Sequence, residues 1–162
     1  MKDVVIRRAR PADAPEIARM ANLLAAISTS ASEAPARRGM TAETVLADII
    51  DSDYGLACDV AEADGRVAGY SLHQTAYESA YAARGRYLSE IYVDEWARRR
   101  GIARALLRSL AQEAHRDDGG FLWWITLGKD AAAQKLYAEI ADVADPVTAY
   151  AVTGEAFQKL LR

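Results

Sequence analysis

The stretch that decides the fold reads LSEIYVDEWARRRGIARALLRSLAQEA and covers residues 88–114. Its first six residues predict a largely buried strand, and the apolar residues from Ile102 to Leu110 recur at helical spacing. Three arginines and Gly101 lie between the strand and the helix. The first amides and the dipole of a helix attract anions, and guanidinium groups add positive charge. We therefore expect an anion site, suited to a pyrophosphate, at residues 98–104, although a run of charges is more often only a solvated loop.

The rest of the chain predicts strands and helices on both sides of this unit. Asp64-Gly65 separates two strand-like runs and is a strong hairpin signal. The expected strands are Val4–Ile6, Leu56–Ala63, Arg66–Thr75, Tyr87–Val93, Phe121–Leu127 and Pro146–Val152. The expected helices are Asp13–Ile27, a short one from Thr41 to Ile50 with Thr41 as its N-cap, Gly101–Glu113, Ala131–Ile140 capped by Asp130, and Glu155–Leu161. Residues 77–85 are expected to form a loop. This order predicts a mixed α/β (α+β) fold, with residues 1–162 as one domain.

Composition limits the partners that we expect. The chain has 162 residues, a net charge of −3 and 51% hydrophobic residues, which is typical of one soluble globular domain. An acidic chain with a single arginine cluster does not favour nucleic-acid binding, and no run of about 18 apolar residues is present to span a membrane. Its single cysteine favours a cytoplasmic location. We expect no metal, because His73 and His115 are far apart and have no cysteines near them.

Arg98-x-x-Gly101-x-Ala103 resembles the Arg/Gln-x-x-Gly-x-Gly/Ala loop of the GNAT N-acetyltransferase superfamily. Residues 88–93 look like the central strand of that family, and residues 101–113 like its following helix. Residues 121–127 and 131–137 resemble the next strand and helix. The ending Tyr150–Glu155 is similar to that of the diamine (spermidine/spermine) N-acetyltransferase-like group. The resemblance covers most of the chain.

This resemblance implies a splayed, mostly antiparallel mixed sheet flanked by helices, with acetyl-CoA as cosubstrate between two parting strands. The implied pantetheine contacts are Ile91, Tyr92 and Val93, and also Asp130, which stands where the family usually has an asparagine. The pyrophosphate is expected over Arg98, Arg99, Arg100, Gly101, Ile102, Ala103 and Arg104. An extended arm with two amides can hydrogen-bond the edge of a strand, which gives this placement a physical basis.

Acetyl transfer to an amine needs a group that takes a proton from the ammonium and a group that protonates the departing thiolate. Glu90 is the candidate for the first task, with an ion pair to an arginine as the structural alternative. Tyr137 matches the family tyrosine placed beside the coenzyme sulfur and is the candidate general acid; a packing role is its alternative. The family's usual first acid of an adjacent pair is Ser89 in this chain, and its helix-ending glycine is Ala141.

For the acceptor we expect a primary amine of a small molecule, bound near Tyr81, Glu90 and Trp124, because aromatic faces attract ammonium groups. A protein amine is an alternative acceptor. A second class of function is a non-catalytic acyl-CoA sensor, suggested by Ser89 and Asp130. A third is a small nucleic-acid-binding domain built on the arginine cluster, which the acidic net charge disfavours. We also expect a homodimer, in which the predicted strand at residues 147–152 pairs across a two-fold axis.

Overall fold

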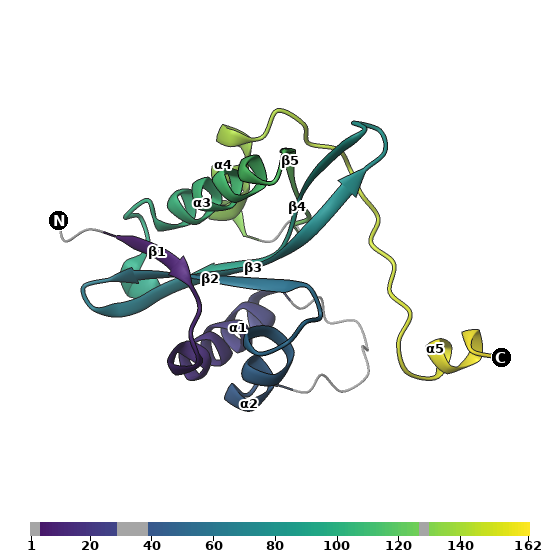
Figure 1. Ribbon diagram of the computed structural model, residues 1–162, viewed down its shortest axis with the longest axis horizontal. Helices are drawn as coiled ribbons and strands as arrows, with labels where there is room; N and C mark the ends of the chain where they lie inside the picture. The colour runs from purple at the N-terminus through teal and green to yellow at the C-terminus, as the bar shows by residue number, and fades with distance from the viewer. Residues whose placement is uncertain (1–3, 29–38, 127–129) are drawn as a thin grey trace. The chain divides into compact units, whose positions relative to one another are not determined.

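A five-stranded sheet, in the order β1-β2-β3-β4-β5, organises the computed structural model, which describes residues 4–28, 39–126 and 130–162 (Figure 1). The chain divides into two compact units: residues 1–26 with 40–125, and residues 27–39 with 126–162. The sheet lies in the first unit. Its strands are β1 (Val5–Arg8), β2 (Leu56–Ala63), β3 (Arg66–Glu78), β4 (Ala83–Val93) and β5 (Gly119–Trp124).

Strands β1 to β4 are antiparallel to their neighbours, whereas β5 is parallel to β4. A parallel neighbour requires a crossover, and the helix α3 (Ile102–Arg116) supplies it. The predicted mixed α/β fold with a mostly antiparallel sheet is therefore confirmed. The assignment of residues 1–162 to one domain stays a prediction.

Helices cover both faces of the sheet (Figure 1). On one face lie α1 (Ala14–Ser28) and α2 (Ala42–Val45), which continues into the π-helical turn Leu46–Ile50. Ile17 and Met20 of α1 pack there with Val60, Tyr70 and Tyr92 of the strands. On the other face, Ile102 and Leu106 of α3 pack on Ala61, Ala63 and Ala68, whose small side chains allow a helix to approach closely.

The Asp64-Gly65 hairpin is confirmed. Both residues have positive φ, +54° and +72°, as a type I′ turn requires. The predicted caps are also confirmed: the Thr41 side chain accepts a hydrogen bond from the Thr44 amide, and the Asp130 side chain accepts from the amides of Ala132 and Ala133. Among the helices of the described residues, none is both long and apolar enough to cross a membrane.

The loop predicted at residues 77–85 is wrong. Strand β3 continues to Glu78 and β4 begins at Ala83, so only a four-residue turn remains. Gly85 suggested a loop, but it is a buried strand residue. A Cβ on Gly85 would lie 2.5 Å from the carbonyl oxygen of Phe121, so the glycine allows β5 to approach β4.

The strand predicted at Pro146–Val152 is also wrong. In the second unit, α4 (Ala131–Ile140) and α5 (Gly154–Leu160) are joined by residues without helix or strand. Alternating apolar residues form a strand only when another strand supplies hydrogen bonds, and the described part of this unit contains no other strand. The strand predicted at Phe121–Leu127 ends at Trp124, and Leu127 lies outside the described residues.

Candidate active site

Strands β4 and β5 pair over only part of β4. The last pair is Leu88 with Trp124, while β4 continues to Val93. Beyond Leu88, β4 therefore has β3 on one edge and no strand of the described residues on the other. Ser89 is the extra residue of a bulge, because Leu72 pairs with Glu90 and His73 pairs with Leu88. A bulge bends and twists its strand, which helps to separate the two strands here.

The register decides which backbone groups face this open edge. The amide of Asp94 donates to the carbonyl of Ala68 at 2.9 Å. Successive residues of an antiparallel strand direct their amides and carbonyls to alternate edges. The backbone groups of Glu90 and Tyr92 therefore face β3, and those of Ile91 and Val93 face the open edge. Ile91 and Val93 thus present backbone groups at the open edge, whereas Tyr92 turns its backbone away and buries its ring with α1; the predicted contacts of these residues with a cofactor stay predictions.

The turn after β4 leads directly into the N-terminus of α3. Gly101 precedes the helix with φ +77°, and the first helical bond runs from the Ala105 amide to the Gly101 carbonyl at 3.0 Å. The amides of Ile102 and Ala103 come before this bond and point out of the helix end. The first turn of α3 contains no acidic residue to offset the positive end of the helix dipole. This end of the helix can hold an anion.

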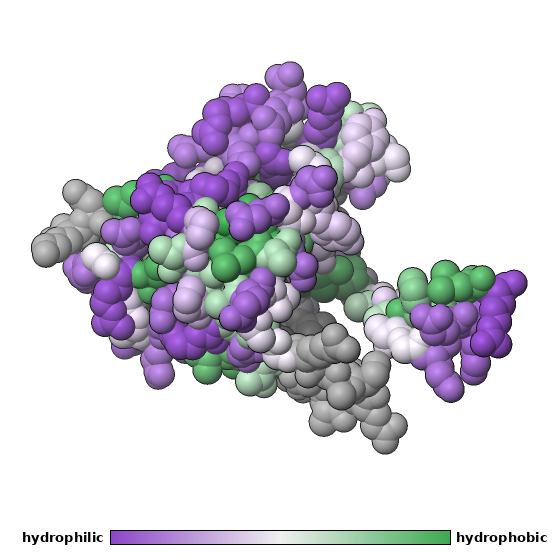
Figure 2. Space-filling model, turned by 60° about the horizontal axis from the view of Figure 1, so that its bottom comes forward, coloured by the Kyte–Doolittle hydropathy of each residue, from purple (hydrophilic) through white to green (hydrophobic). Residues whose placement is uncertain are grey.

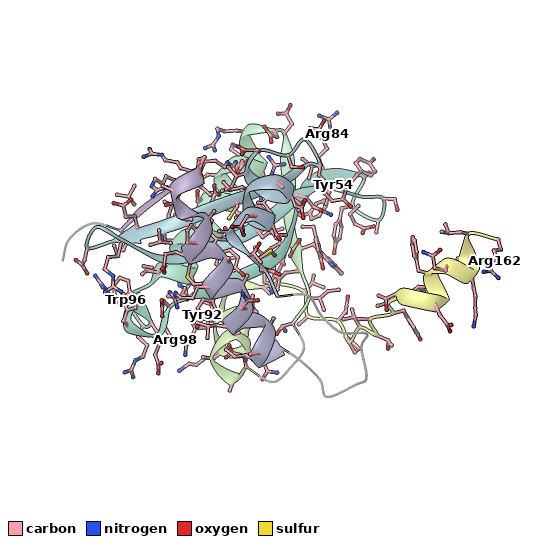
Figure 3. All side chains as sticks on the ribbon, turned by 90° about the horizontal axis from the view of Figure 1, so that it is seen from below. Tyr54, Arg84, Tyr92, Trp96, Arg98 and Arg162 are labelled. Carbon is pink, nitrogen blue, oxygen red and sulfur yellow. The ribbon has the colours of Figure 1, made fainter. Side chains whose placement is uncertain are left out.

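The three consecutive arginines diverge. Nε of Arg98 donates to the carbonyl of Val93 at 3.2 Å, and its guanidinium lies 5.7 Å from the centre of the Tyr92 ring. Arg100 turns to the hairpin, where its Nη2 lies 3.0 Å from Oδ2 of Asp64. Arg99 is exposed with φ +59°. Arg98 and Arg100 therefore anchor the loop to the sheet, and Arg99 is left facing solvent. Figure 3 shows Arg98 and Trp96 at the end of the sheet opposite Tyr54 and Arg84.

Glu90 has a buried hydrogen-bond donor. The Tyr70 hydroxyl lies 2.6 Å from Oε2 of Glu90, and the Tyr70 side chain is 1% exposed. Burial, followed by the negative charge of Glu90, raises the pKa of Tyr70, so the hydroxyl stays protonated and donates. Within the described residues, no arginine pairs with Glu90, and the carboxylate is half-buried beside the bulge. Sequence reasoning missed Tyr70, because the register that pairs β3 with β4 has no signal in the sequence.

The other candidate residues are distributed as follows. Trp124 ends β5 opposite Leu88, at the point where the strands part. Tyr81 is half exposed in the β3–β4 turn, with its ring 5.9 Å from that of Phe121. At about 3.3 Å per strand residue, Tyr81 lies roughly 20 Å from Glu90, so the structure does not bring these two residues together. Tyr137 and Asp130 belong to the second unit, and their roles stay predictions. Burial raises the pKa of Tyr137 above its ordinary value.

Comparisons with known proteins agree with this arrangement. The Acetyltransferase (GNAT) family matches residues 20–141. No curated protein sequence matches the chain. Among solved structures, the chain is similar to the integron cassette protein VCH_CASS6 of V. cholerae, with 20% identity, a TM-score of 0.76 and 98% of each chain covered.

Two further similar structures carry enzyme names. A ribosomal-protein-alanine N-acetyltransferase from Brucella melitensis is 25% identical, with 93% of this chain and 99% of that chain covered and a TM-score of 0.72. An aminoglycoside N-acetyltransferase in complex with CoA is 18% identical, with 93% and 95% covered and a TM-score of 0.72. The family match extends over the parted strands and the arginine loop that leads into α3. The chain therefore belongs to the GNAT acetyltransferase family.

Proposed function

We propose that the protein moves an acetyl group from acetyl-CoA to a primary amine of a small molecule, by direct transfer in a ternary complex. One observation carries the proposal: the open edge of β4 at Ile91 and Val93 runs directly into the loop at the N-terminus of α3. An extended pantetheine arm can pair with the open strand edge, and a pyrophosphate can bind at the N-terminus of the helix. A similar structure that contains CoA supports the choice of cosubstrate.

In this proposal the pantetheine amides pair with the backbone of Ile91 and Val93. The pyrophosphate lies at the amides of Gly101, Ile102 and Ala103, with positive charge added by the exposed guanidinium groups of Arg99 and Arg104. Arg98 and Arg100 hold the loop through Val93 and Asp64 rather than by direct contact with the phosphates. Asp130 caps α4 through Oδ1, which accepts both capping bonds.

The transfer itself needs a balanced movement of protons. The acceptor ammonium loses a proton, its nitrogen attacks the thioester carbonyl carbon, and the carbon–sulfur bond of the tetrahedral intermediate then breaks. We assign the first proton to Glu90, directly or through water, and protonation of the thiolate to Tyr137; the second proton, which the nitrogen releases as the amide forms, restores the Tyr137 phenol. Burial raises the pKa of Tyr137, which keeps the phenol protonated at neutral pH, as the role of proton donor requires.

A protein amine is the second candidate acceptor, and it is favoured by the similarity to a ribosomal-protein-alanine N-acetyltransferase. Membership of the spermidine/spermine-like subgroup is a proposal only. The ending that suggested it, residues 150–155, forms no strand. A cytoplasmic location also stays part of the proposal. Comparing peptides with a free N-terminus, polyamines and aminoglycosides as acetyl acceptors would distinguish these classes of acceptor.

We further propose a homodimer. The second unit exposes large apolar side chains along residues 143–152 and at α5, and Figure 2 shows an apolar side on this helix. They are Val143, Val147, Tyr150, Val152, Phe157, Leu160 and Leu161. We infer that these side chains contact another chain, because large exposed apolar surfaces are typical of such contacts.

The experiment that tests the function measures thiol release from acetyl-CoA across this amine panel. Burial raises the pKa of Cys58 to about 12, so the protein's only cysteine does not react with the thiol reagent during the assay. We expect release only with an amine present, and mass spectrometry should find the acetylated amine. Binding of acetyl-CoA without turnover on any amine would favour the non-catalytic sensor.

A further inference from the structure

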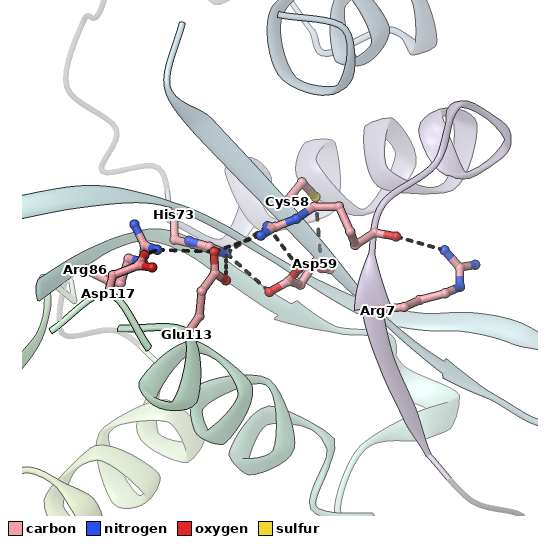
Figure 4. A network of polar contacts seen from close by, with 8 residues as sticks. Arg7, Cys58, Asp59, His73, Arg86, Glu113 and Asp117 are labelled. Atoms are coloured by element: carbon pink, nitrogen blue, oxygen red, sulfur yellow. Dashed lines mark hydrogen bonds and ion pairs between the residues drawn. The ribbon is translucent and has the colours of Figure 1, made fainter. Parts of the chain in front are cut away.

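A second polar cluster lies between the sheet and α3, away from the arginine loop. Asp59 of β2, His73 of β3 and Glu113 of α3 converge there (Figure 4). His73 is fully buried and Asp59 is 5% exposed. Glu113 follows Gly101 by twelve residues, so at 1.5 Å per helical residue it lies roughly 18 Å from the proposed pyrophosphate site. The Tyr70–Glu90 pair lies on the face of the sheet that α1 covers, whereas His73 faces α3, so the sheet separates the cluster from the candidate base as well.

The geometry of the cluster matches the donor set of a metal ion. Nε2 of His73 lies 3.3 Å from Oδ2 of Asp59 and 3.8 Å from Oε2 of Glu113, and the three ligand atoms lie within 4.8 Å of one another. Tetrahedral zinc with bonds of about 2.0–2.1 Å separates its ligand atoms by roughly 3.3 Å. All three side chains are held by strands or a helix, so small side-chain movements would suffice to complete the site.

His73 is the residue that points most clearly to a ligand. Its Nδ1 is buried and has no hydrogen-bond partner in the described part of the chain, so Nε2 alone makes the polar contacts of this ring. Its Nε2 faces both the carboxylate of Asp59 and, at 3.4 Å, Nη1 of Arg8. The first contact needs a proton on Nε2 and the second needs a lone pair, so neither neutral tautomer satisfies both. A cation between Nε2 and the two carboxylates would use the lone pair and remove this conflict.

The charges of the cluster also favour a cation. Arg8 contacts the outer oxygens, Oδ1 of Asp59 at 3.0 Å and Oε1 of Glu113 at 2.8 Å, and Arg86 contacts Glu113 and Asp117. Three carboxylates and two guanidinium groups leave a charge of −1 with His73 neutral. The Arg8 side chain is half exposed and can turn into solvent. A divalent ion in place of its guanidinium brings the charge to zero.

We propose that Asp59, His73 and Glu113 form a binding site for a divalent cation of the Zn²⁺ type, entered from the side that Arg8 covers. Imidazole and carboxylate donors suit this ion. The bound ion would join β2, β3 and α3. The expectation of no metal took only histidines and cysteines into account as ligands. The carboxylates of Asp59 and Glu113 come close to His73 only in the folded chain.

The test uses the full chain after treatment with a chelator, titrated with ZnCl₂ and, in parallel, with CoCl₂. We expect one equivalent of Zn²⁺ by calorimetry and a rise in Tm of roughly 5–10 °C at 100 times the dissociation constant. Co²⁺ should give the visible absorption of a low-coordinate site. Glu113→Gln should weaken binding at least about 10-fold. Arg8→Gln should strengthen it, because the competing guanidinium is gone.

His115→Gln is the matched control, because His115 is an exposed histidine of the same helix outside the cluster. Its Zn²⁺ affinity should equal that of the wild type. The proposal is overturned if neither the wild type nor Arg8→Gln binds Zn²⁺, or if His115→Gln loses the ion. Because Arg8 is half exposed, Arg8→Gln keeps the test decisive even if Glu113→Gln fails to fold. Neither readout depends on acetyl transfer, so failure of the proposed function would leave this test unaffected.

Discussion

The Tyr70 hydroxyl and the Glu90 carboxylate form a 2.6 Å hydrogen bond between adjacent strands, on the face of the sheet that α1 covers. Leu72 is the residue directly opposite Glu90, so Tyr70 is its diagonal neighbour. A fully buried ring thus fixes one carboxylate oxygen of the candidate base. In the proposed function, the other oxygen would meet the ammonium group of the acceptor.

This bond predicts that Tyr70→Phe lowers turnover, because the Glu90 carboxylate loses the donor that fixes it in place. A hydrogen bond to a charged group is worth about 1.5–3 kcal/mol, so we expect kcat/KM to fall by roughly 10- to 100-fold. Tyr54→Phe, at a position 79% exposed, is the matched control and should leave kcat/KM unchanged.

A second variant separates this role from packing. Glu90→Gln removes the carboxylate itself, so adding Tyr70→Phe to it should lower kcat/KM little further. Fully additive losses in the double variant would instead show that Tyr70 acts on stability or packing, independently of Glu90.

Gly101→Val should weaken acetyl-CoA binding at least about 10-fold. A β-branched residue is strained at φ +77°, and the loop must shift away from the geometry that presents its amides. Gly55→Val is a close control: Gly55 has φ +87° and the same open space around its Cα, but it precedes β2. Calorimetry should find normal affinity in Gly55→Val. Equal acetyl-CoA affinities in both variants would show that the pyrophosphate does not bind at this loop.

The link between β1 and the start of α1 should make the fold sensitive to acid. Hydrogen bonds from Arg7, at 2.7 and 2.9 Å, hold the pKa of Asp13 below its usual range, and the Arg10 amide donates to it as well. Because the pKa is lowered on folding, the stabilisation is present above the ordinary pKa of an aspartate and is lost as the pH falls through the lowered value. Asp13→Asn should reduce the free energy of unfolding at neutral pH by about 3 kcal/mol.

Urea denaturation at several pH values would measure this effect, with Asp53→Asn at an exposed position as control. The difference between Asp13→Asn and the wild type should shrink as the pH falls below the usual aspartate range. A constant difference at all pH values would contradict the ionic origin of the stabilisation.

Much of this fold follows from local sequence signals. Asp64-Gly65 sets both positive φ angles of its turn, Thr41 and Asp130 cap helices as their positions predict, and the helical spacing after Gly101 places Leu106 in the core. In each case the residue and its partner lie within a few positions of each other. Local sequence therefore carries enough information for these elements.

The wrong predictions concern residues whose structure depends on segments that are distant in the sequence. Gly85 is a strand residue because Phe121 packs against it, and Val147–Val152 form no strand because their unit provides no partner strand. Tyr70 reaches Glu90, and Glu113 reaches His73, only through strand register and the placement of α3. The arginine loop was predictable because one short segment contains all of it.

The exposed apolar residues of the second unit predict a homodimer at micromolar concentrations. Phe157→Asp and Leu160→Asp on α5 should shift it toward a monomer, because a charge placed in an apolar contact must lose its hydration. Light scattering would measure the mass, with Lys159→Asp as control at a polar position between them. A monomeric mass for the wild type at these concentrations would contradict the proposed dimer.

The final prediction concerns the leaving group and rests on the role proposed for Tyr137. Tyr137→Phe removes one oxygen and keeps the ring, so packing and acetyl-CoA affinity should change little. Turnover should fall by roughly 100- to 10,000-fold, the usual range for loss of a general acid. Because burial raises the pKa of Tyr137, the wild-type phenol stays protonated beyond its ordinary range, and the alkaline decline of kcat due to this group should lie above pH 10. Tyr137→Phe should lack that decline. Wild-type turnover in Tyr137→Phe, measured where chemistry limits the rate, would make Tyr137 a packing residue and leave protonation of the thiolate to solvent.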